Sequence, residues 1–304
     1  MNTTLRDDVQ KVFETAAWCE QTGSGHLLVS GPDAANWLQR LLSQDILKVA
    51  VGSGAYAGLL DRKGMIQATS YVLRVELDAF HLISAPPLAE KMGPLLRRFK
   101  FMEKVELKDQ ISDWSFCHLM GPRVSQRLIE LGVITSEPPP QQILHLPEGL
   151  LWLDSIYQKP VWHLLTTKAS LPSFLNQIPP VGLESYEILR QESGIPRDGI
   201  DINEQNTLLE ANMHYAYARF KGCYPGQEVM ERILSYGQGK TPRVLKTFHF
   251  QGARDLPPGA PVKTEEGVAV GQMTSAVYNP YTDQMVVLGY VERKYEGVNL
   301  GNFG

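Results

Sequence analysis

Hydrophobic and polar positions switch between strand and helix patterns along the first third of the chain. A short apolar run at residues 26–30 leads through a Gly-Pro-Asp turn into residues 34–42, where apolar side chains recur at the spacing of one helical face. The pattern then predicts three strands separated by polar turns, a helix and an edge strand, at residues 55–60, 65–75, 79–84, 86–99 and 105–107.

The same order recurs ninety residues further along. A run at residues 116–120 leads through a second Gly-Pro turn into another helical face, so that Gly31 aligns with Gly121 and Leu38 with Leu128. Any strand-to-helix corner can use Gly-Pro, so this stretch alone leaves repeat and coincidence equally open. Two further strands and a short helix match the end of the first half, at residues 150–155, 161–167 and 171–178. We therefore expect an α+β fold with two ferredoxin-like β-α-β-β-α units and antiparallel sheets.

The character changes again after Gly239. Short strands without helical periodicity are separated by Gly, Pro, Asn and Asp turns, at residues 244–250, 260–263, 268–274 and 285–291. Regularly spaced short strands are typical of a small β-barrel or sandwich. The expected domains are a first α/β unit, a second α/β unit and a C-terminal β-barrel, at residues 1–112, 113–239 and 240–304.

Composition and charge exclude several classes of protein. The chain of 304 residues has a formal net charge of -4 and no tract of Lys and Arg, so direct nucleic-acid binding is not expected. Asp7 and Asp8 interrupt the segment where a signal peptide needs an apolar region, and no run of 18 apolar residues suggests a membrane span, so we expect a cytoplasmic protein. Three scattered cysteines, and histidines without metal-ligand spacing, favour neither a disulfide framework nor a metal site.

The most informative stretch is Lys-Gly-Cys-Tyr-Pro-Gly-Gln-Glu at residues 221–228, which leads into a helical face at residues 229–234. The helix is expected to begin near Pro225, which places Cys223 just before its N-terminus. The helix dipole and the cation of Lys221 would both favour a thiolate there. The alternative is a buried structural cysteine in a tight turn, because free cysteine is one of the most buried residue types.

This motif resembles that of the YgfZ-type folate-binding proteins, relatives of the glycine-cleavage T-protein (aminomethyltransferase). Residues 30–34 resemble the opening strand-helix corner of this superfamily, and residues 190–196 resemble its R-x-E-x-G-x-P segment. The C-terminal strands resemble its small barrel. The resemblance covers nearly the whole chain and implies two α/β domains and a barrel around a central tetrahydrofolate cavity.

The resemblance also assigns roles to residues. It implies that Glu192 binds the pterin ring, that Tyr186 lines the pterin pocket and that Arg232 pairs with the glutamyl carboxylate of the folate. The alternatives are a solvated Glu192, a core Tyr186 and a surface ion pair of Arg232 with Glu228. The motif residues are Lys221, Gly222, Cys223, Tyr224, Gly226, Gln227 and Glu228, with Cys223 as the functional thiol supported by Lys221.

One departure from the family changes the functional expectation. Aminomethyltransferases carry a catalytic Asp on the hairpin strand after the Gly-rich turn, but residues 64–70 contain no carboxylate, and Asp61 is explained by its turn. The resemblance then implies a tetrahydrofolate-binding accessory factor for iron-sulfur cluster assembly or repair, tRNA modification among the processes served. Its partners would be folate and iron-sulfur client enzymes or assembly proteins. A folate-dependent one-carbon transferase with a rearranged acid and a scaffold without folate remain the alternatives.

Overall fold

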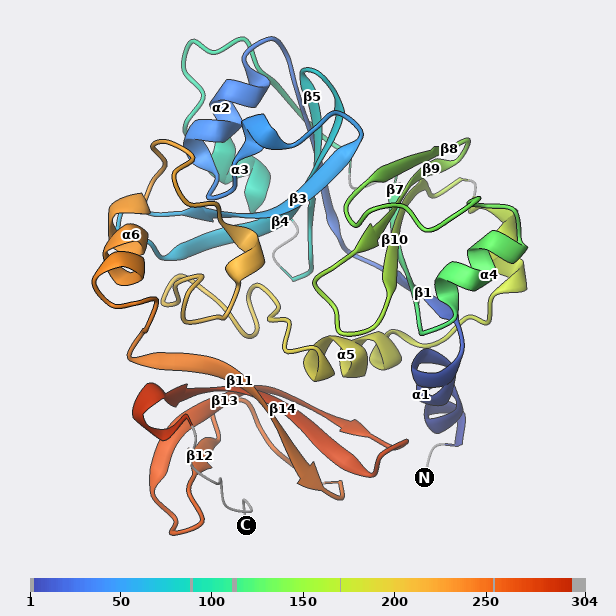
Figure 1. The fold of residues 1–304 in the computed structure, drawn as a ribbon, viewed down its shortest axis with the longest axis vertical. Helices are drawn as coiled ribbons and strands as arrows, with labels where there is room; N and C mark the ends of the chain where they lie inside the picture. The colour runs from blue at the N-terminus through green and yellow to red at the C-terminus, as the bar shows by residue number, and fades with distance from the viewer. Residues whose placement is uncertain (1–2, 88–89, 111–113, 170, 254, 297–304) are drawn as a thin grey trace.

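Three antiparallel sheets form the framework of the protein (Figure 1). The structure is a computed structural model that describes residues 3–87, 90–110, 114–169, 171–253 and 255–296. Two five-stranded sheets lie side by side, and a four-stranded sheet lies beyond helix α5 (Leu183–Glu192). The expected mixed α/β architecture with antiparallel sheets is confirmed.

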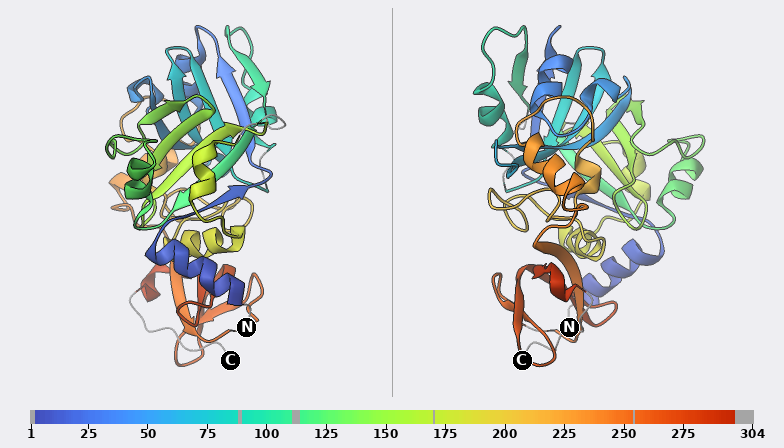
Figure 2. Two further views of the ribbon diagram at one scale, coloured as in Figure 1. Left: turned by 90° about the vertical axis from the view of Figure 1, so that its right-hand side faces the viewer. Right: turned by 60° about the vertical axis from the view of Figure 1, so that its left-hand side comes forward.

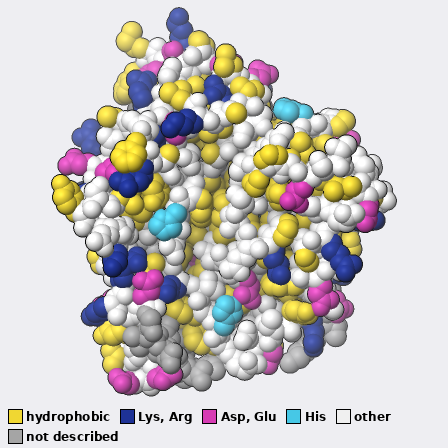
Figure 3. Space-filling model, in the orientation of Figure 1, with side chains coloured by type: hydrophobic (Ala, Val, Ile, Leu, Met, Phe, Trp, Pro, Cys, Tyr) yellow, Lys and Arg dark blue, Asp and Glu magenta, His cyan; other side chains and the backbone are white. Residues whose placement is uncertain are grey.

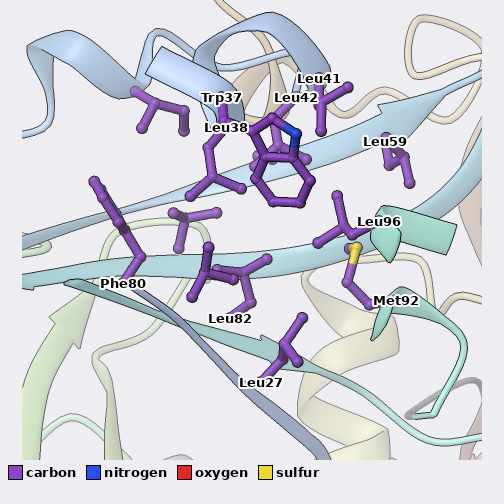
Figure 4. Close-up of a cluster of buried hydrophobic side chains, with 14 of the residues drawn as sticks. Leu27, Trp37, Leu38, Leu41, Leu42, Leu59, Phe80, Leu82, Met92 and Leu96 are labelled. Carbon is purple, nitrogen blue, oxygen red and sulfur yellow. The ribbon is translucent and has the colours of Figure 1, made fainter. Parts of the chain in front are cut away.

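The first unit is a sheet in the order β3-β4-β5-β2-β6 with two helices on one face. Its elements are β2 (Gly25–Ser30), α2 (Ala34–Leu41), η1 (Ile46–Lys48), β3 (Ser53–Leu60), β4 (Ile66–Glu76), β5 (Ala79–Ser84), α3 (Met92–Arg97) and β6 (Glu106–Asp109). Trp37 and Leu38 of α2 pack onto Phe80 and Leu82 of β5 in a buried cluster (Figure 4). The prediction that a helix begins at residue 86 is wrong, because α3 begins at Met92. Pro86 precedes Pro87, and a residue directly before a proline disfavours helical backbone.

The second unit repeats this plan. Its elements are β7 (Trp114–Met120), α4 (Val124–Glu130), β8 (Ile143–Leu146), β9 (Gly149–Asp154), β10 (Val161–Thr167) and the 3-10 helix η2 (Ser173–Gln177), joined by α1 (Thr3–Glu14) and β1 (Ala17–Gln21). The strand order is β8-β9-β10-β7-β1, the same as in the first unit, with β7 in the place of β2 and β1 in the place of β6. The edge strand β1 precedes the first unit in sequence but pairs with β7. The domain bounds stay predictions. The pairing of β1 with β7 adds that an N-terminal strand belongs to the sheet of the second unit.

The Gly-Pro corner has the same backbone in both units. Gly31 and Gly121 each have φ of 119°. A Cβ on Gly31 would lie 2.3 Å from the carbonyl oxygen of Lys104, and one on Gly121 would lie 2.5 Å from that of Thr15. Both corners therefore need glycine for a positive φ and for close packing against backbone. The predicted repeat of strand, corner and helix is confirmed.

The C-terminal sheet corrects the expected barrel. Its strands are β11 (Arg243–Gln251), β12 (Pro261–Lys263), β13 (Ala269–Asn279) and β14 (Gln284–Glu292), in the order β11-β14-β13-β12, followed by η4 (Arg293–Tyr295). Figure 2 shows this sheet curling as a half-barrel. Within the described residues the end strands β11 and β12 each pair on one side only, so the sheet does not close.

The chain between α5 and the C-terminal sheet is mostly irregular. It contains η3 (His214–Ala216) and the motif helix α6 (Gln227–Ser235), which lies beside the first unit (Figure 1). Tyr224 and Met230 pack there with Leu60 and Ile66 in a buried cluster. No helix in the described parts of the chain is both long and apolar enough to cross a membrane.

Candidate functional site

A pocket lies where the two α/β units meet, and its empty volume of about 520 Å³ includes space that is open to solvent. Strands of both units and the segment that follows α5 contribute its walls. Its lining residues are Gln21, Tyr56, Tyr71, Ile83, Ala85, Phe116, Ile156, Tyr157, Tyr186, Arg190, Ile195, Pro196, Arg197, Asp198 and Tyr215, and we call it the tyrosine pocket. Hydrophobic side chains gather along the seam between the two units on the face shown in Figure 3.

Aromatic rings in contact with one another form the pocket walls. The ring of Tyr56 meets Tyr71 edge-on at 4.8 Å and Tyr215 at 5.6 Å between centroids. Tyr186 stacks on His118 with 3.8 Å between ring centroids, and its hydroxyl lies 2.6 Å from that of Tyr157. Rings held by neighbouring rings lose little entropy when they contact a ligand, so these walls suit a planar, partly aromatic molecule.

A buried hydrogen-bond network supports the pocket from behind. His118 and His163 lie 2.9 Å apart through their Nδ1 atoms, and the Nε2 of His163 lies 3.0 Å from Asp154. The hydroxyl of Tyr71 also donates to Asp154, while the Nε2 of His118 lies 2.6 Å from the side chain of Gln21. Burial raises the pKa of Tyr71 and lowers that of His118. The network thus holds two lining residues, Tyr71 and Gln21, in place, and burial keeps Tyr71 and His118 neutral.

Two charged residues of the pocket keep polar atoms without a partner. Asp198 is 5% exposed, and its Oδ2 accepts the backbone N–H of Thr69 on β4 at 2.9 Å, whereas its Oδ1 has no hydrogen-bond partner. Arg197 pairs through Nη2 with Glu187, and its Nε has no partner. Burial raises the pKa of Asp198 to about 6, more than the Thr69 hydrogen bond lowers it. The hydroxyl of Tyr215 is likewise unpartnered.

Sequence reasoning missed Arg197 and Asp198. The two residues directly follow Pro196 and belong to no periodic pattern. The one signal in the sequence is their position next to the 190–196 segment. Neighbouring Arg190 differs from them, because its guanidinium is committed to Asp201 at 2.9 Å and to Glu187 at 3.1 Å. Arg190 therefore holds the loop, while Arg197 and Asp198 retain binding capacity.

The structure brings only one of the three residues assigned to folate into this pocket. Tyr186 lines it, as expected. Glu192 bonds instead to His249 at 2.7 Å and Asn279 at 3.1 Å, which joins α5 to the C-terminal sheet. Burial alone would raise the pKa of Glu192, but these hydrogen bonds outweigh it and lower the pKa. Arg232 is exposed on α6. The ligand contacts of Glu192 and Arg232 stay predictions.

The Lys-Gly-Cys motif holds its loop against the first unit. The amino group of Lys221 donates to the backbone carbonyls of Gln39 and Leu42 at the end of α2, and burial lowers its pKa to about 8. Gly226 has φ of 81°, and a Cβ there would lie 2.5 Å from the carbonyl oxygen of Asp61. Gln227 accepts the backbone N–H of Tyr224 at 3.3 Å. These contacts give most of the motif residues a structural role in holding the loop.

Cys223 is the exception within the motif. Its side chain is exposed, whereas Cys19 and Cys117 are buried. The structure therefore does not support a buried structural role for Cys223. The helix α6 begins at Gln227, two residues later than expected, and Cys223 is not among the residues that line the tyrosine pocket. The motif thus presents this thiol to solvent on a fixed turn.

Several known proteins with a similar sequence or fold are aminomethyltransferases. The model of the GCVT N-terminal domain matches residues 1–136. The aminomethyltransferase of Rubrobacter xylanophilus is 26% identical to this chain, and the match covers 96% of this chain and 80% of that protein. An aminomethyltransferase of Thermus thermophilus is also 26% identical, and its match covers 90% of this chain and 78% of that protein. These matches show similarity to proteins of the GcvT-like superfamily. The aminomethyltransferase T of the Bartonella henselae glycine cleavage system shares the fold, with a TM-score of 0.81 and 19% sequence identity. The superposition covers 96% of this chain and 82% of that protein.

Proposed function

We propose that this chain binds tetrahydrofolate in the tyrosine pocket. The observation that carries the proposal is a pocket with aromatic walls in which a buried acceptor of Asp198 and a buried donor of Arg197 lack partners. A flat ring with polar edges fits such a site. When bound, the folate supplies a one-carbon carrier; the protein supplies the stacking surface and the polar contacts. The similarity to aminomethyltransferases supports the same ligand class.

We further propose a YgfZ-type accessory role in the assembly or repair of iron-sulfur clusters in client enzymes, with Cys223 as the functional thiol. Two observations support it. Strand β4 lacks a carboxylate over residues 66–70, where the related transferases carry their acid. The motif keeps Cys223 exposed while Lys221, Tyr224 and Gly226 are engaged in packing.

Calorimetry with tetrahydrofolate under reducing, anaerobic conditions tests the first proposal. We expect saturable binding to the intact chain and at least a tenfold weaker affinity for Tyr186→Ala, because a stacking wall is lost. An absence of detectable binding at millimolar folate would refute folate binding and favour the scaffold alternative.

The thiol is tested in cells that lack the endogenous protein. We expect Cys223→Ala to bind folate normally but to lose most of the support for iron-sulfur enzymes under oxidative stress. Cys223→Ser is the companion variant that keeps the size and polarity of the side chain. Full complementation by both variants would show that the motif is a structural turn.

Aminomethyl transfer is the second candidate function, and one contact favours it. The Oδ2 of Asp198 accepts the N–H of Thr69 at 2.9 Å, so a carboxylate from a different segment lies against β4. Such a group with a pKa of about 6 can exchange a proton near neutral pH. Formation of methylene-tetrahydrofolate from aminomethyl donors by purified protein decides this question, and turnover equal to that of buffer excludes it.

A further inference from the structure

We propose that Arg197 and Asp198 select the ligand by its edge: they bind a planar heterocycle that presents a ring N–H beside a ring carbonyl, the cyclic amide of a pteridine. This inference rests on the proposed folate binding and names the residues that recognise the ring. The Oδ1 of Asp198 is the free acceptor for the N–H, and the Nε of Arg197 is the free donor for the carbonyl.

Both side chains are fixed by their other atoms. Asp198 is held through Oδ2 by the N–H of Thr69, and the hydroxyl of Thr69 in turn accepts that of Tyr56 at 3.0 Å. The guanidinium of Arg197 is held through Nη2 by Glu187, and the backbone N–H of Arg197 donates to Asp201 at 2.9 Å. The two remaining atoms are therefore positioned before a ligand arrives, which reduces the entropy lost on binding.

The free atoms cost stability until a partner arrives. An unpaired buried polar group destabilises the folded protein, and more so when it is charged. Both atoms are buried in the pocket wall, so a ligand reaches them only when a lining side chain shifts. A cyclic amide supplies an N–H donor for Asp198 and a carbonyl acceptor for Arg197 at the same time. A purely aromatic ligand would leave both unpaired, so the pair discriminates as well as binds.

Residues assigned by the resemblance give the contrasting hypothesis. Glu192 would be the carboxylate for the pterin, but its two oxygens already accept from His249 and Asn279. Asp198 is less exposed and has an unused oxygen. The structure therefore favours Asp198 over Glu192 as the acceptor for the ring.

Calorimetry with tetrahydrofolate on the intact chain, Asp198→Asn and Glu192→Gln tests the assignment. In Asp198→Asn the amide oxygen can still accept from Thr69, which leaves an N–H facing the ligand where an acceptor is needed. A lost hydrogen bond to a charged group is worth about 1.5–3 kcal/mol, so we expect affinity to fall about 10-fold to 150-fold. Glu192→Gln should bind within about twofold of the intact chain.

The outcomes separate the inference from the proposed function. If the intact chain does not bind tetrahydrofolate, the proposed function fails and the inference with it. If the intact chain binds and Asp198→Asn binds equally well, the inference alone fails. Loss of binding in Glu192→Gln but not in Asp198→Asn would transfer the role to Glu192. Normal binding with lost turnover in Asp198→Asn would make Asp198 an acid for transfer and overturn its role in recognition.

Discussion

At the residue scale, the site places a carboxyl where it destabilises the protein. Burial raises the pKa of Asp198 from 3.8 to about 6. A raised pKa in the folded state means that protonated Asp198 is tolerated, whereas ionised Asp198 opposes folding. Its contribution to stability is therefore fully present below pH 4 and is lost as the pH rises through about 6.

Asp198→Asn should consequently stabilise the protein in a pH-dependent manner. At pH 7.5 we expect a gain on the order of 3 kcal/mol in the free energy of unfolding, shrinking toward zero below pH 4. Urea unfolding at pH 4, 5, 6 and 7.5 measures the difference. A gain of equal size at every pH would show that the carboxyl titrates normally in the folded protein. Higher stability with weaker folate binding would mark Asp198 as a binding residue retained at a cost to stability.

Cysteine reactivity should follow exposure. Cys223 is exposed, whereas Cys19 and Cys117 are buried, and burial raises the pKa of Cys117 to about 12. We expect iodoacetamide to label Cys223 at least tenfold faster than the other two, measured by mass spectrometry after brief exposure. In urea the three rates should converge. Comparable labelling of all three in the native state would contradict the exposed turn.

At the element scale, glycine contacts show how the motif loop is held. Gly226 has φ of 81° and lies against the turn between β3 and β4, where a Cβ would meet backbone at 2.5 Å. Gly222 has φ of 97° but nothing within 4 Å of an added Cβ. We expect Gly226→Ala to cost about 1–3 kcal/mol more than Gly222→Ala, which has only backbone strain. Thermal unfolding of the two variants measures this, and equal losses would contradict the close packing.

The C-terminal sheet is attached through a buried carboxylate. Asp201 is 2% exposed, pairs with Arg190 and accepts the hydroxyls of Thr274 and Ser275 at 2.6 Å each. Asp201→Ala leaves the guanidinium of Arg190 buried without this partner, so we expect a loss of about 3–5 kcal/mol in urea unfolding. Glu192→Gln, which weakens a half-exposed pair with His249, is the control and should cost about 1 kcal/mol or less. Similar losses in both variants would show that the attachment does not depend on Asp201.

Local patterns predict most elements but not their long-range partners. The strands at residues 79–84 and 161–167 have the expected bounds, because alternation and turn residues are local signals. The pairing of β1 with β7 and the open edge of the C-terminal sheet depend on contacts between distant segments. The same holds for the site. Tyr186 is indicated by a resemblance, whereas Asp198 becomes distinctive only when folding buries it against β4.

At the scale of the whole molecule, the tyrosine pocket joins the two units of the repeat. Tyr56 and Tyr71 come from the first unit, Phe116 and Tyr157 from the second, and Asp198 from the segment after α5. No lining residue, among those described, comes from the C-terminal sheet. The sheet is joined to the segment around the pocket by the hydrogen bonds of Thr274 with Asp201 and of His249 with Glu192, two residues that do not line the pocket. A ligand in the pocket would therefore link the two units directly and the sheet only through that segment.

This arrangement predicts where a bound folate slows hydrogen exchange. A ligand that binds only the folded state stabilises it by about 2.7 kcal/mol at 100 times its Kd, and the effect is largest in segments whose opening disrupts the site. With tetrahydrofolate we expect stronger protection of β3, β4, β7 and residues 186–198 together, and a smaller change in β12, at the far edge of the C-terminal sheet. At the same folate concentration, the increase in protection that folate causes should be smaller in Asp198→Asn in all four segments. Protection confined to one unit would place the ligand elsewhere, because a molecule in this pocket contacts both halves of the repeat at once.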